Sequence, residues 1–400
     1  MKNVVIIDGY RTAIGKLSGA IKDVQPEILA SDLMVETLKR CGIDGKDLDE
    51  VILGHAKQSS DQPNIARLAA LHAGIPIEVP AYTVHRQCGS GMQALQNAAQ
   101  MIKSAEAELV LVGGVESMST APYYLRSARN GYKAGNGLLL DPNTESQPRS
   151  QPSKVYGELN MGLTAENLAV KYNISRKEQD EFAYASQVKT RNAMDSGRFA
   201  DEIVPVIMKS RKGDKVFQED EHPRMTTLED LAALKAVFKK DGTVTAGNAS
   251  GRNDGAAMLV VAEEEKALQM GLNIKARIIG QAAAGVSPEI MGIGPAPATR
   301  KALERAGLKL EDIGLIELNE AFAAQSLAVI KELGINPEIV NVNGGAIALG
   351  HPIGCSGARI LVSLIHEMKK RNVRYGLATL CIAGGLGLTT VVENYDFIKK

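Results

Sequence analysis

Short apolar runs alternate with longer stretches of helical periodicity along most of the chain. The apolar runs are rich in Val, Ile and Leu, which is typical of buried strands, whereas the longer stretches repeat apolar residues every three or four positions, which is typical of helices. The predicted strands are Val4–Asp8, Val51–Leu53, Tyr82–Val84, Glu108–Val112 ending at Gly113-Gly114, Met258–Ala262 and Tyr375–Leu380. The predicted helices are Ile28–Arg40, Asn64–Ala73 and Ser90–Ser104. This alternation predicts an α/β fold of βαβ units with a mostly parallel sheet.

The last third of the chain repeats features of the first. KRCGIDGKDLDEVIL (39–53) aligns with ERAGLKLEDIGLIEL at an offset of 265 residues, counted from Arg40 to Arg305. Gly89-Ser90-Gly91 matches Cys355-Ser356-Gly357 at an offset of 266, and each is followed by a predicted helix, a strand and a Gly-Gly pair. We therefore predict two duplicated βαβ halves related by a pseudo-twofold axis, with ligand sites at the carboxyl ends of strands.

Residues 119–242 differ from both halves in composition and in hydrophobic pattern. Gly131–Ser153 is rich in Gly, Pro, Asn and Ser and predicts an irregular loop, while 164–172 and 175–196 show helical patterns. The second of these opens with the Ser-x-x-Glu pattern of a capping box. We interpret the segment as an inserted loop domain that covers the site, with a surface decoration as the alternative. The predicted domains are residues 1–118 with 243–270, the loop domain 119–242, and residues 271–400.

The composition of the chain disfavours binding to nucleic acid or to a membrane. Lys plus Arg and Asp plus Glu number 46 each, so no overall field attracts nucleic acid or an anionic membrane. Aromatic residues make up only 4% of the chain, which disfavours base-stacking platforms. No apolar window is long enough to span a bilayer or to act as a secretory signal. We expect a cytoplasmic protein that has no nucleic-acid or membrane partner.

The cysteines indicate neither a disulfide framework nor a metal site. They are Cys41, Cys88, Cys355 and Cys381. None forms a CxxC pair, and no Cys/His spacing matches a zinc site, so we predict no metal. Four cysteines in a chain of this length favour a reducing compartment.

The stretch AYTVHRQCGSGMQA (81–94) places Cys88 between a predicted strand and a predicted helix. The free N–H groups and the dipole at a helix start favour a thiolate over a thiol. The small residues Gly89, Ser90 and Gly91 let a ligand approach closely. We therefore hypothesise that Cys88 is a nucleophile; a buried structural cysteine is the alternative.

Three further glycine-rich turns carry reactive side chains at predicted strand ends. A nucleophilic thiol needs a base, and of the six histidines His351 is the best candidate because only it lies inside such a turn; His55 is a weaker alternative. Cys381 is either a proton-transferring thiol or a small buried hydrophobe. The Asn319 amide and the backbone N–H groups of the turns suit an oxyanion.

The sequences around these turns closely resemble those of the thiolase family. The matching motifs run in family order over nearly the whole chain: CGSGMQA (88–94), GGVESMSTAPY (113–123), MGLTAEN (161–167), GTVTAGNASG (242–251), NEAFAAQ (319–325), NVNGGAIALGHPIGCSGAR (341–359) and CIAGG (381–385). The resemblance implies a thiolase-like fold with a layered α-β-α-β-α core.

The resemblance also implies a role for each reactive group. Cys88 takes the acyl group as a thioester, His351 activates it, and Cys381 moves the α-proton of acetyl-CoA. Asn319, through a water, and His351 stabilise the enolate oxygen, while the N–H groups of Cys88 and Ala383 hold the tetrahedral intermediate. The implied enzyme is an acyltransferase, an acetyl-CoA C-acetyltransferase that forms or cleaves acetoacetyl-CoA or another 3-oxoacyl-CoA by Claisen condensation.

Coenzyme A is implied as a substrate that lies under residues 119–242, and no permanently bound cofactor is expected. Family positions for its contacts carry over onto Met161, Arg224, Phe238, Ala246, Ala249, Ser250 and Phe322. The resemblance also implies acyl-CoA partners and a homodimer or homotetramer.

Four residues depart from the family pattern near the nucleophile and the expected acyl chain. His85 stands where Asn is usual, Asn160 where the short-chain branch has His, Ala383 inside a glycine run and Leu386 where Gln or Met is common. Chain-length preference and reaction direction therefore stay open. The alternatives are a longer-chain degradative 3-ketoacyl-CoA thiolase of β-oxidation, a decarboxylating condensing enzyme of the same superfamily, and a non-catalytic acyl-CoA-binding protein.

Overall fold

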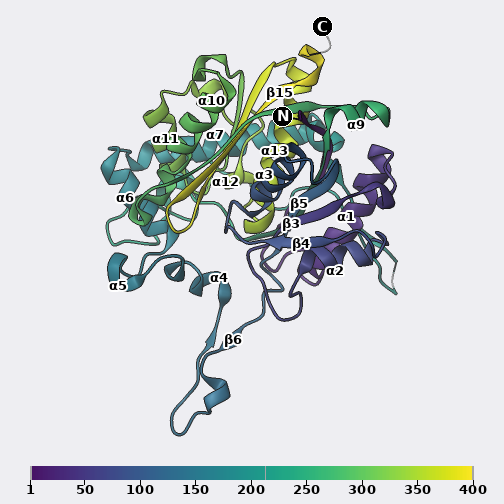
Figure 1. The fold of residues 1–400 in the computed structure, drawn as a ribbon. Helices are drawn as coiled ribbons and strands as arrows, with labels where there is room; N and C mark the ends of the chain where they lie inside the picture. Colours follow the sequence, from purple (N-terminus) through teal and green to yellow (C-terminus); the bar gives the residue numbers. More distant parts are fainter. Residues whose placement is uncertain (1, 212, 399–400) are drawn as a thin grey trace.

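One path of hydrogen-bonded strands crosses the whole molecule (Figure 1). The computed structural model describes residues 2–211 and 213–398. In order across the sheet, the strands are β13 (Leu315–Leu318), β14 (Tyr375–Ile382), β15 (Leu386–Asn394), β12 (Ala276–Gly285), β1 (Val4–Thr12), β11 (Asn253–Glu263), β5 (Leu109–Ser117), β3 (Glu50–Gly54) and β4 (Ala81–Val84). Two short strands, β2 (Gly15–Lys16) and β8 (Ile203–Val204), pair with β11 and β1 off this path.

The strand order repeats in the two halves of the chain, as the sequence predicts. β3, β5, β11 and β1 are successive neighbours in the first half, and β13, β14, β15 and β12 follow the same order in the second. The halves meet where β1 pairs antiparallel with its counterpart β12, at Val5↔Arg277 and Ile6↔Ala276. Pairing of equivalent strands in opposite directions is what a pseudo-twofold axis produces.

The sheet is mixed, so the prediction of a mostly parallel sheet is wrong. β3 runs parallel to β4 and β5, and β13 runs parallel to β14, but β5–β11, β11–β1, β14–β15 and β15–β12 are antiparallel. In the second half the reason is a hairpin. Residues 383–385 connect β14 directly to β15, and a short turn of this kind permits only antiparallel pairing.

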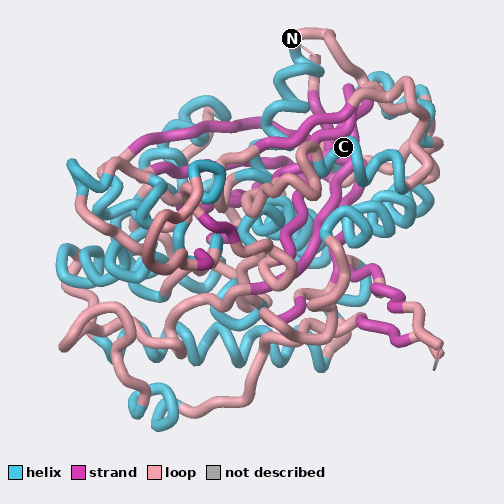
Figure 2. Tube along the Cα trace, turned by 90° about the horizontal axis from the view of Figure 1, so that it is seen from below, coloured by secondary structure: helices cyan, strands magenta, loops and turns pink. Residues whose placement is uncertain are grey.

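Helices cover and separate the two halves in five layers. The helices α1 (Pro26–Cys41) and α2 (Ile65–His72) pack on the outer face of the first half, and α10 (Pro295–Ala306) and α11 (Ala323–Leu333) pack on the outer face of the second. Between the halves, α3 (Ser90–Lys103) and α13 (Ile353–Arg371) pack against each other. Figure 2 shows the strands in the interior with helices around them. The layers are therefore helix, sheet, helix, sheet, helix.

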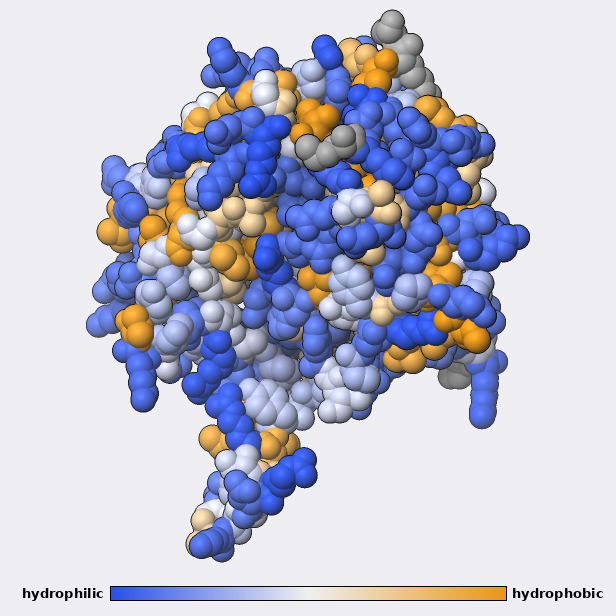
Figure 3. Space-filling model, viewed as in Figure 1, coloured by the Kyte–Doolittle hydropathy of each residue, from blue (hydrophilic) through white to orange (hydrophobic). Residues whose placement is uncertain are grey.

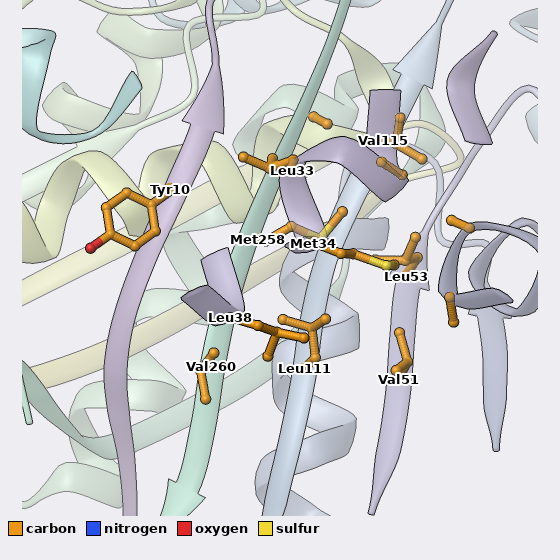
Figure 4. Close-up of a cluster of buried hydrophobic side chains, with 14 of the residues drawn as sticks. Tyr10, Leu33, Met34, Leu38, Val51, Leu53, Leu111, Val115, Met258 and Val260 are labelled. Atoms are coloured by element: carbon orange, nitrogen blue, oxygen red, sulfur yellow. The ribbon is translucent and has the colours of Figure 1, made fainter. Parts of the chain in front are cut away.

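The central strands are apolar on both faces because helices cover both sides of each half. Along β1, Val5 and Ile7 belong to the outer cluster with α1, whereas Val4 and Ile6 belong to the central cluster with α3 and α13. Figure 4 shows the outer cluster, in which Leu33 and its neighbours on α1 lie over side chains of β3, β5 and β11. Burial on both faces explains the unbroken apolar runs of the sequence.

Strand β5 continues past Gly113-Gly114, where the sequence predicts its end. It pairs with β11 as far as Ser117. A Cβ at Gly113 would lie 2.2 Å from the Ala257 carbonyl oxygen, and one at Gly114 would lie 2.1 Å from the Gly354 carbonyl oxygen. These glycines therefore allow neighbouring backbone to pack closely and do not form a turn.

Residues 119–242 take the place of a hairpin turn. In the second half, 383–385 join β14 to β15, whereas the equivalent β5 and β11 are joined by this long segment. A hairpin of β6 (Tyr124–Leu125) and β7 (Leu139–Leu140) projects from the body (Figure 1). The capping box predicted for 175–196 is present at the start of α7. The other elements are α4 (Pro142–Glu145), α5 (Ser153–Tyr156), α6 (Met161–Lys171), α7 (Arg176–Asp195), β9 (Val206–Met208), β10 (Lys215–Phe217) and α8 (Leu228–Ala233), with α9 (Glu264–Gln269) and α12 (Ala346–Leu349) outside the segment.

Candidate active site

One cavity brings together reactive groups from separate turns of both halves. Cys88 lies between β4 and α3, His351 lies in the turn before α13, and Cys381 and Ala383 lie at the carboxyl end of β14. All four residues line the cavity. The two central helices begin here, so the ends of strands from both halves converge on the same place, as the sequence predicts.

A strained turn presents Cys88 to the cavity. The preceding residue, Gln87, has φ of 46°, a left-handed conformation that non-glycine residues rarely adopt. Its side-chain amide donates to Ser150 Oγ at 3.3 Å, and Ser150 belongs to the segment 119–242. The Cys88 residue is half-buried in the cavity wall. The backbone strain therefore coincides with the nucleophile predicted from the sequence.

The Cys88 thiol is protonated in the free protein. Burial raises the pKa of Cys88 to about 11, and the opposing influences of the Ala383 and Cys88 N–H groups and of Lys57 do not offset it. The donors at the turn do favour the thiolate, in the direction that the sequence predicts, but burial outweighs them. A base must remove the thiol proton during reaction.

His351 has the tautomer that such a base needs. The Ser356 hydroxyl donates its only proton to the Pro352 carbonyl oxygen at 2.9 Å. Ser356 Oγ also lies 2.6 Å from His351 Nδ1, so it must accept a proton there, and Nδ1 is the protonated nitrogen. Nε2 is therefore the unprotonated acceptor. It is buried and has no hydrogen-bond partner among the described residues.

The surroundings of His351 also keep the ring neutral. Burial lowers the pKa of His351 to about 4, and the nearby Arg359 guanidinium acts in the same direction, while Glu116 opposes it. A neutral imidazole with a free Nε2 can accept a proton at neutral pH. Sequence reasoning missed Ser356, although its position five residues after the base in the same turn was a usable signal.

Two further predicted residues differ in their position relative to the cavity: Cys381 lines it, whereas Asn319 does not. Cys381 is 1% exposed and lines the cavity. Burial raises its pKa, and a thiolate at the neighbouring Cys88 would raise it further, so Cys381 carries its proton. Asn319 is fully buried and is absent from the cavity wall, yet neither of its side-chain amide atoms has a partner among the described residues. An unpaired buried amide is a group available to a water or a ligand.

Most of the residues predicted to contact coenzyme A line one apolar side of the cavity. These are Met161, Phe238, Ala249, Ser250 and Phe322. The Phe238 and Phe322 rings meet edge to face with their centroids 6.1 Å apart. The structure therefore brings five of the seven predicted contacts together beside Cys88.

The remaining two predicted contacts, Arg224 and Ala246, lie outside this wall. Arg224 Nη2 donates to the Ala246 carbonyl oxygen at 2.8 Å. Arg224 lines a neighbouring cavity together with Arg252, and Arg252 also lines the main cavity. The two cavities are thus adjacent, and the role predicted for Arg224 at the outer end of the ligand remains a prediction.

A buried carboxylate that sequence reasoning missed connects the two halves beneath the site. Glu116 accepts hydrogen bonds from the backbone N–H groups of Ala56 (3.1 Å), Lys57 (3.0 Å) and Gly354 (2.8 Å). Its charge also faces His55, whose Nδ1 lies 3.1 Å away. His55 does not line the cavity, so the alternative base predicted from the sequence is a partner of Glu116. These partners are distant in sequence, so no local pattern could have found them.

Metal-binding clusters and membrane-spanning helices are both absent from the part of the chain that the structure describes. Within residues 2–211 and 213–398, no group of His, Cys, Asp and Glu side chains is arranged to hold a metal ion. None of the helices described is both long and apolar enough to cross a membrane.

Comparison with known proteins gives full-length matches. The models for "Thiolase, N-terminal domain" and "Thiolase, C-terminal domain" match residues 4–265 and 272–394. Acetyl-CoA acetyltransferases of Syntrophomonas wolfei and Escherichia coli are each 50% identical, covering 98% and 99% of this chain and 99% and 100% of those proteins. The crystal structure of the Bacillus anthracis acetyl-CoA acetyltransferase matches with a TM-score of 0.96 and 51% identity, over 98% of this chain and 99% of that one. Human mitochondrial 3-ketoacyl-CoA thiolase in complex with CoA matches with a TM-score of 0.93 and 44% identity, over 98% of each chain. The fold predicted from the sequence is confirmed.

Proposed function

The chain belongs to the thiolase family, and we propose that it transfers acyl groups between coenzyme A thioesters through an acyl–Cys88 intermediate. Its relatives include proteins named acetyl-CoA acetyltransferase, so the reaction is the formation or cleavage of acetoacetyl-CoA or another 3-oxoacyl-CoA. The observation that carries the proposal is the cavity shared by Cys88, His351 and Cys381. A non-catalytic acyl-CoA-binding protein would have no need of a neutral base beside a thiol.

Acylation uses the Cys88–His351 pair. His351 Nε2 takes the proton from Cys88 Sγ, and the sulfur attacks C3 of the 3-oxoacyl-CoA. The negative charge that develops on the C3 oxygen is held by the backbone N–H groups of Cys88 and Ala383. The positions of these groups support the assignment, because the Ala383 N–H already interacts with the Cys88 sulfur.

Carbon–carbon cleavage follows from the tetrahedral intermediate. As the carbonyl reforms, the C2–C3 bond breaks and leaves acyl–Cys88 and the enolate of acetyl-CoA. Cys381 gives its thiol proton to the enolate carbon, and His351 with a water held by Asn319 stabilises the enolate oxygen. Acetyl-CoA leaves, and the thiol of a second coenzyme A attacks the acyl thioester. Its proton passes to the Cys381 thiolate, and the departing Cys88 sulfur takes back the proton held by His351. In the synthetic direction the same steps run in reverse, with Cys381 removing the α-proton.

Coenzyme A binds as a substrate on the apolar side of the cavity, under residues 119–242. This side is apolar because it is formed by Met161 at the start of α6, Phe238 in the segment between α8 and β11, and Phe322 just before α11. Human mitochondrial 3-ketoacyl-CoA thiolase, which matches over nearly its whole length, is described in complex with CoA. We assign residues 1–118 with 243–270 and residues 271–400 to the two core halves and residues 119–242 to the cover, supported by the insertion of the cover at a hairpin position.

A homodimer or homotetramer is the proposed assembly. β4 is an edge strand of the sheet, and the β6–β7 hairpin projects from the body with Tyr123, Leu138 and Leu139 more than half exposed (Figures 1 and 3). An open edge and an exposed apolar projection both call for a covering partner. Light scattering on the purified protein measures the mass directly. The four unpaired cysteines support a reducing compartment, which we take to be the cytoplasm.

The decisive variant is Cys88→Ala, assayed for thiolysis of acetoacetyl-CoA. We expect cleavage to be lost, while Cys41→Ala, which removes a thiol on α1 far along the chain from the site, retains it. Thermal unfolding of both variants checks that each is folded. Thiolysis by folded Cys88→Ala at the wild-type rate would overturn the proposed function.

A further inference from the structure

The cavity has a second wall whose chemistry differs from the coenzyme A side. Residues 141–150, around α4, contribute Asn143, Ser146, Gln147 and Ser150 to it, and Gln87 joins them from the nucleophile turn. All five side chains carry a hydroxyl or an amide. A plain alkyl chain would gain little from such a polar wall, although hydrogen bonds within the protein already engage Gln87, Asn143, Gln147 and Ser150.

The Ser146 hydroxyl on this wall is a donor without an acceptor. Lys57 Nζ donates to Ser146 Oγ at 2.7 Å and to the Pro142 carbonyl oxygen at 3.1 Å. An ammonium can only donate, so Ser146 Oγ accepts from Lys57 and keeps its own proton for another partner. No acceptor for that proton is present among the described residues, and Ser146 lines the cavity. The hydroxyl is thus directed and polarised by a buried ammonium, since Lys57 is 6% exposed.

A second cation lies on the same wall. Arg252 lines the cavity and its Nη1 lies 3.7 Å from Asp141 Oδ2. Burial lowers the pKa of Lys57, and the Arg252 charge acts in the same direction, while the charges of Glu116 and Asp141 oppose the shift. Glu116 lies nearby, but its carboxylate is already occupied by three backbone N–H groups and His55. Asp141 faces Arg252 directly, so a further carboxylate on this wall would meet the Ser146 hydroxyl proton together with the Lys57 and Arg252 cations.

We propose that the acyl chain of the preferred substrate ends in a carboxylate, which the Ser146 hydroxyl binds with Lys57 behind it and Arg252 beside it. The substrate class is then a 3-oxo-dicarboxylic acid held as its mono-coenzyme A thioester. Proximity to the reacting sulfur supports the placement, because the Lys57 charge also acts on Cys88. This specificity rests on the proposed function, since it concerns the acyl group carried by Cys88.

The test compares two substrates with the same six-carbon chain in the thiolysis assay. 3-Oxoadipyl-CoA ends in a carboxylate and 3-oxohexanoyl-CoA ends in a methyl group. We expect kcat/KM of the wild-type protein to be at least about tenfold higher for 3-oxoadipyl-CoA, since a hydrogen bond to a charged group is worth at least this much. Ser146→Ala and Lys57→Met should each reduce the ratio of the two kcat/KM values severalfold or more. Lys301→Met, which changes an exposed lysine on the outer helix α10, should leave the ratio unchanged.

Acetoacetyl-CoA separates failure of this proposal from failure of the proposed function. Cleavage of acetoacetyl-CoA together with equal or lower kcat/KM for 3-oxoadipyl-CoA would overturn the specificity and leave the reaction standing. A preference that survives in both Ser146→Ala and Lys57→Met would overturn the assigned residues. Failure of the wild-type protein to cleave any 3-oxoacyl-CoA would overturn both proposals.

Discussion

Ser356→Ala tests whether a single hydrogen bond makes His351 a base. The Ser356 hydroxyl gives its proton to the Pro352 carbonyl oxygen, so its oxygen is the acceptor that keeps a proton on His351 Nδ1. Alanine removes this acceptor. The Nδ1–H group is then buried without a partner, which costs about 1–3 kcal/mol of the free energy of unfolding.

The effect on rate should be larger than the effect on stability. Without Ser356 the proton is free to reside on Nε2, and this nitrogen then cannot accept the Cys88 proton. General-base catalysis contributes about 10²- to 10⁴-fold, and a histidine held in the wrong tautomer loses a comparable factor in other enzymes. We therefore expect acetylation of Cys88 by acetyl-CoA to slow roughly 10²- to 10⁴-fold.

Rapid-quench mass spectrometry of Cys88 acetylation measures this rate, and urea unfolding measures stability. Ser363→Ala is the matched control, because Ser363 lies on the same helix and its buried hydroxyl donates to Glu202 Oε1 at 3.0 Å. The control should lose a similar amount of stability but acetylate Cys88 at the wild-type rate. Acetylation of Ser356→Ala within about threefold of wild type, or an equal slowing in the control, would refute the tautomer argument.

Three other changes test separate parts of the structure. Gly114→Ala places a carbon 2.1 Å from the Gly354 carbonyl oxygen and should lower the free energy of unfolding by about 1–3 kcal/mol or more. In the control Gly255→Ala, the nearest neighbour of the added carbon is 3.4 Å away, so the free energy of unfolding should change by less than about 1 kcal/mol. Urea titration measures both variants. The pKa of His351 is about 4 in the folded protein against 6.5 ordinarily, so the unfolded chain binds the extra proton and stability rises with pH across that window. His351→Gln removes this titrating group, so its urea midpoint should rise less steeply over the same pH range. An unchanged slope would contradict the assignment. Cys381→Ala should still accept an acetyl group on Cys88 but lose at least about 10²-fold in condensation to acetoacetyl-CoA, and condensation at the wild-type rate would remove Cys381 from the mechanism.

Much of the fold follows from local pattern. The apolar runs predict several of the central strands because those strands are buried on both faces. The internal repeat predicts a pseudo-twofold axis, and the structure shows the two halves joined by the pairing of β1 with β12. Whether neighbouring strands run parallel or antiparallel could not be predicted from local pattern. Whether two neighbouring strands are joined by a helix or by a hairpin depends on long-range pairing, and in the first half the hairpin is hidden by the insertion of 119–242.

The site was predictable where chemistry sits in glycine-rich turns, as for Cys88, His351 and Cys381. It was not predictable where a residue acts through partners far away in sequence. Glu116 lies beyond the end of the predicted strand, and its contact with Gly354 is visible only in the structure. The protonation state of Cys88 also needed the structure, since burial and the donors of the turn act in opposite directions and only their balance decides.

Mass spectrometry of the protein after brief exposure to acetyl-CoA tests the central claim most directly. The acyl–Cys88 mechanism predicts one acetyl group on the peptide that contains Cys88, which added coenzyme A removes, and no such adduct in Cys88→Ala. A protein that cleaves acetoacetyl-CoA while the acetyl group appears on Cys381, or on no residue at all, would contradict it.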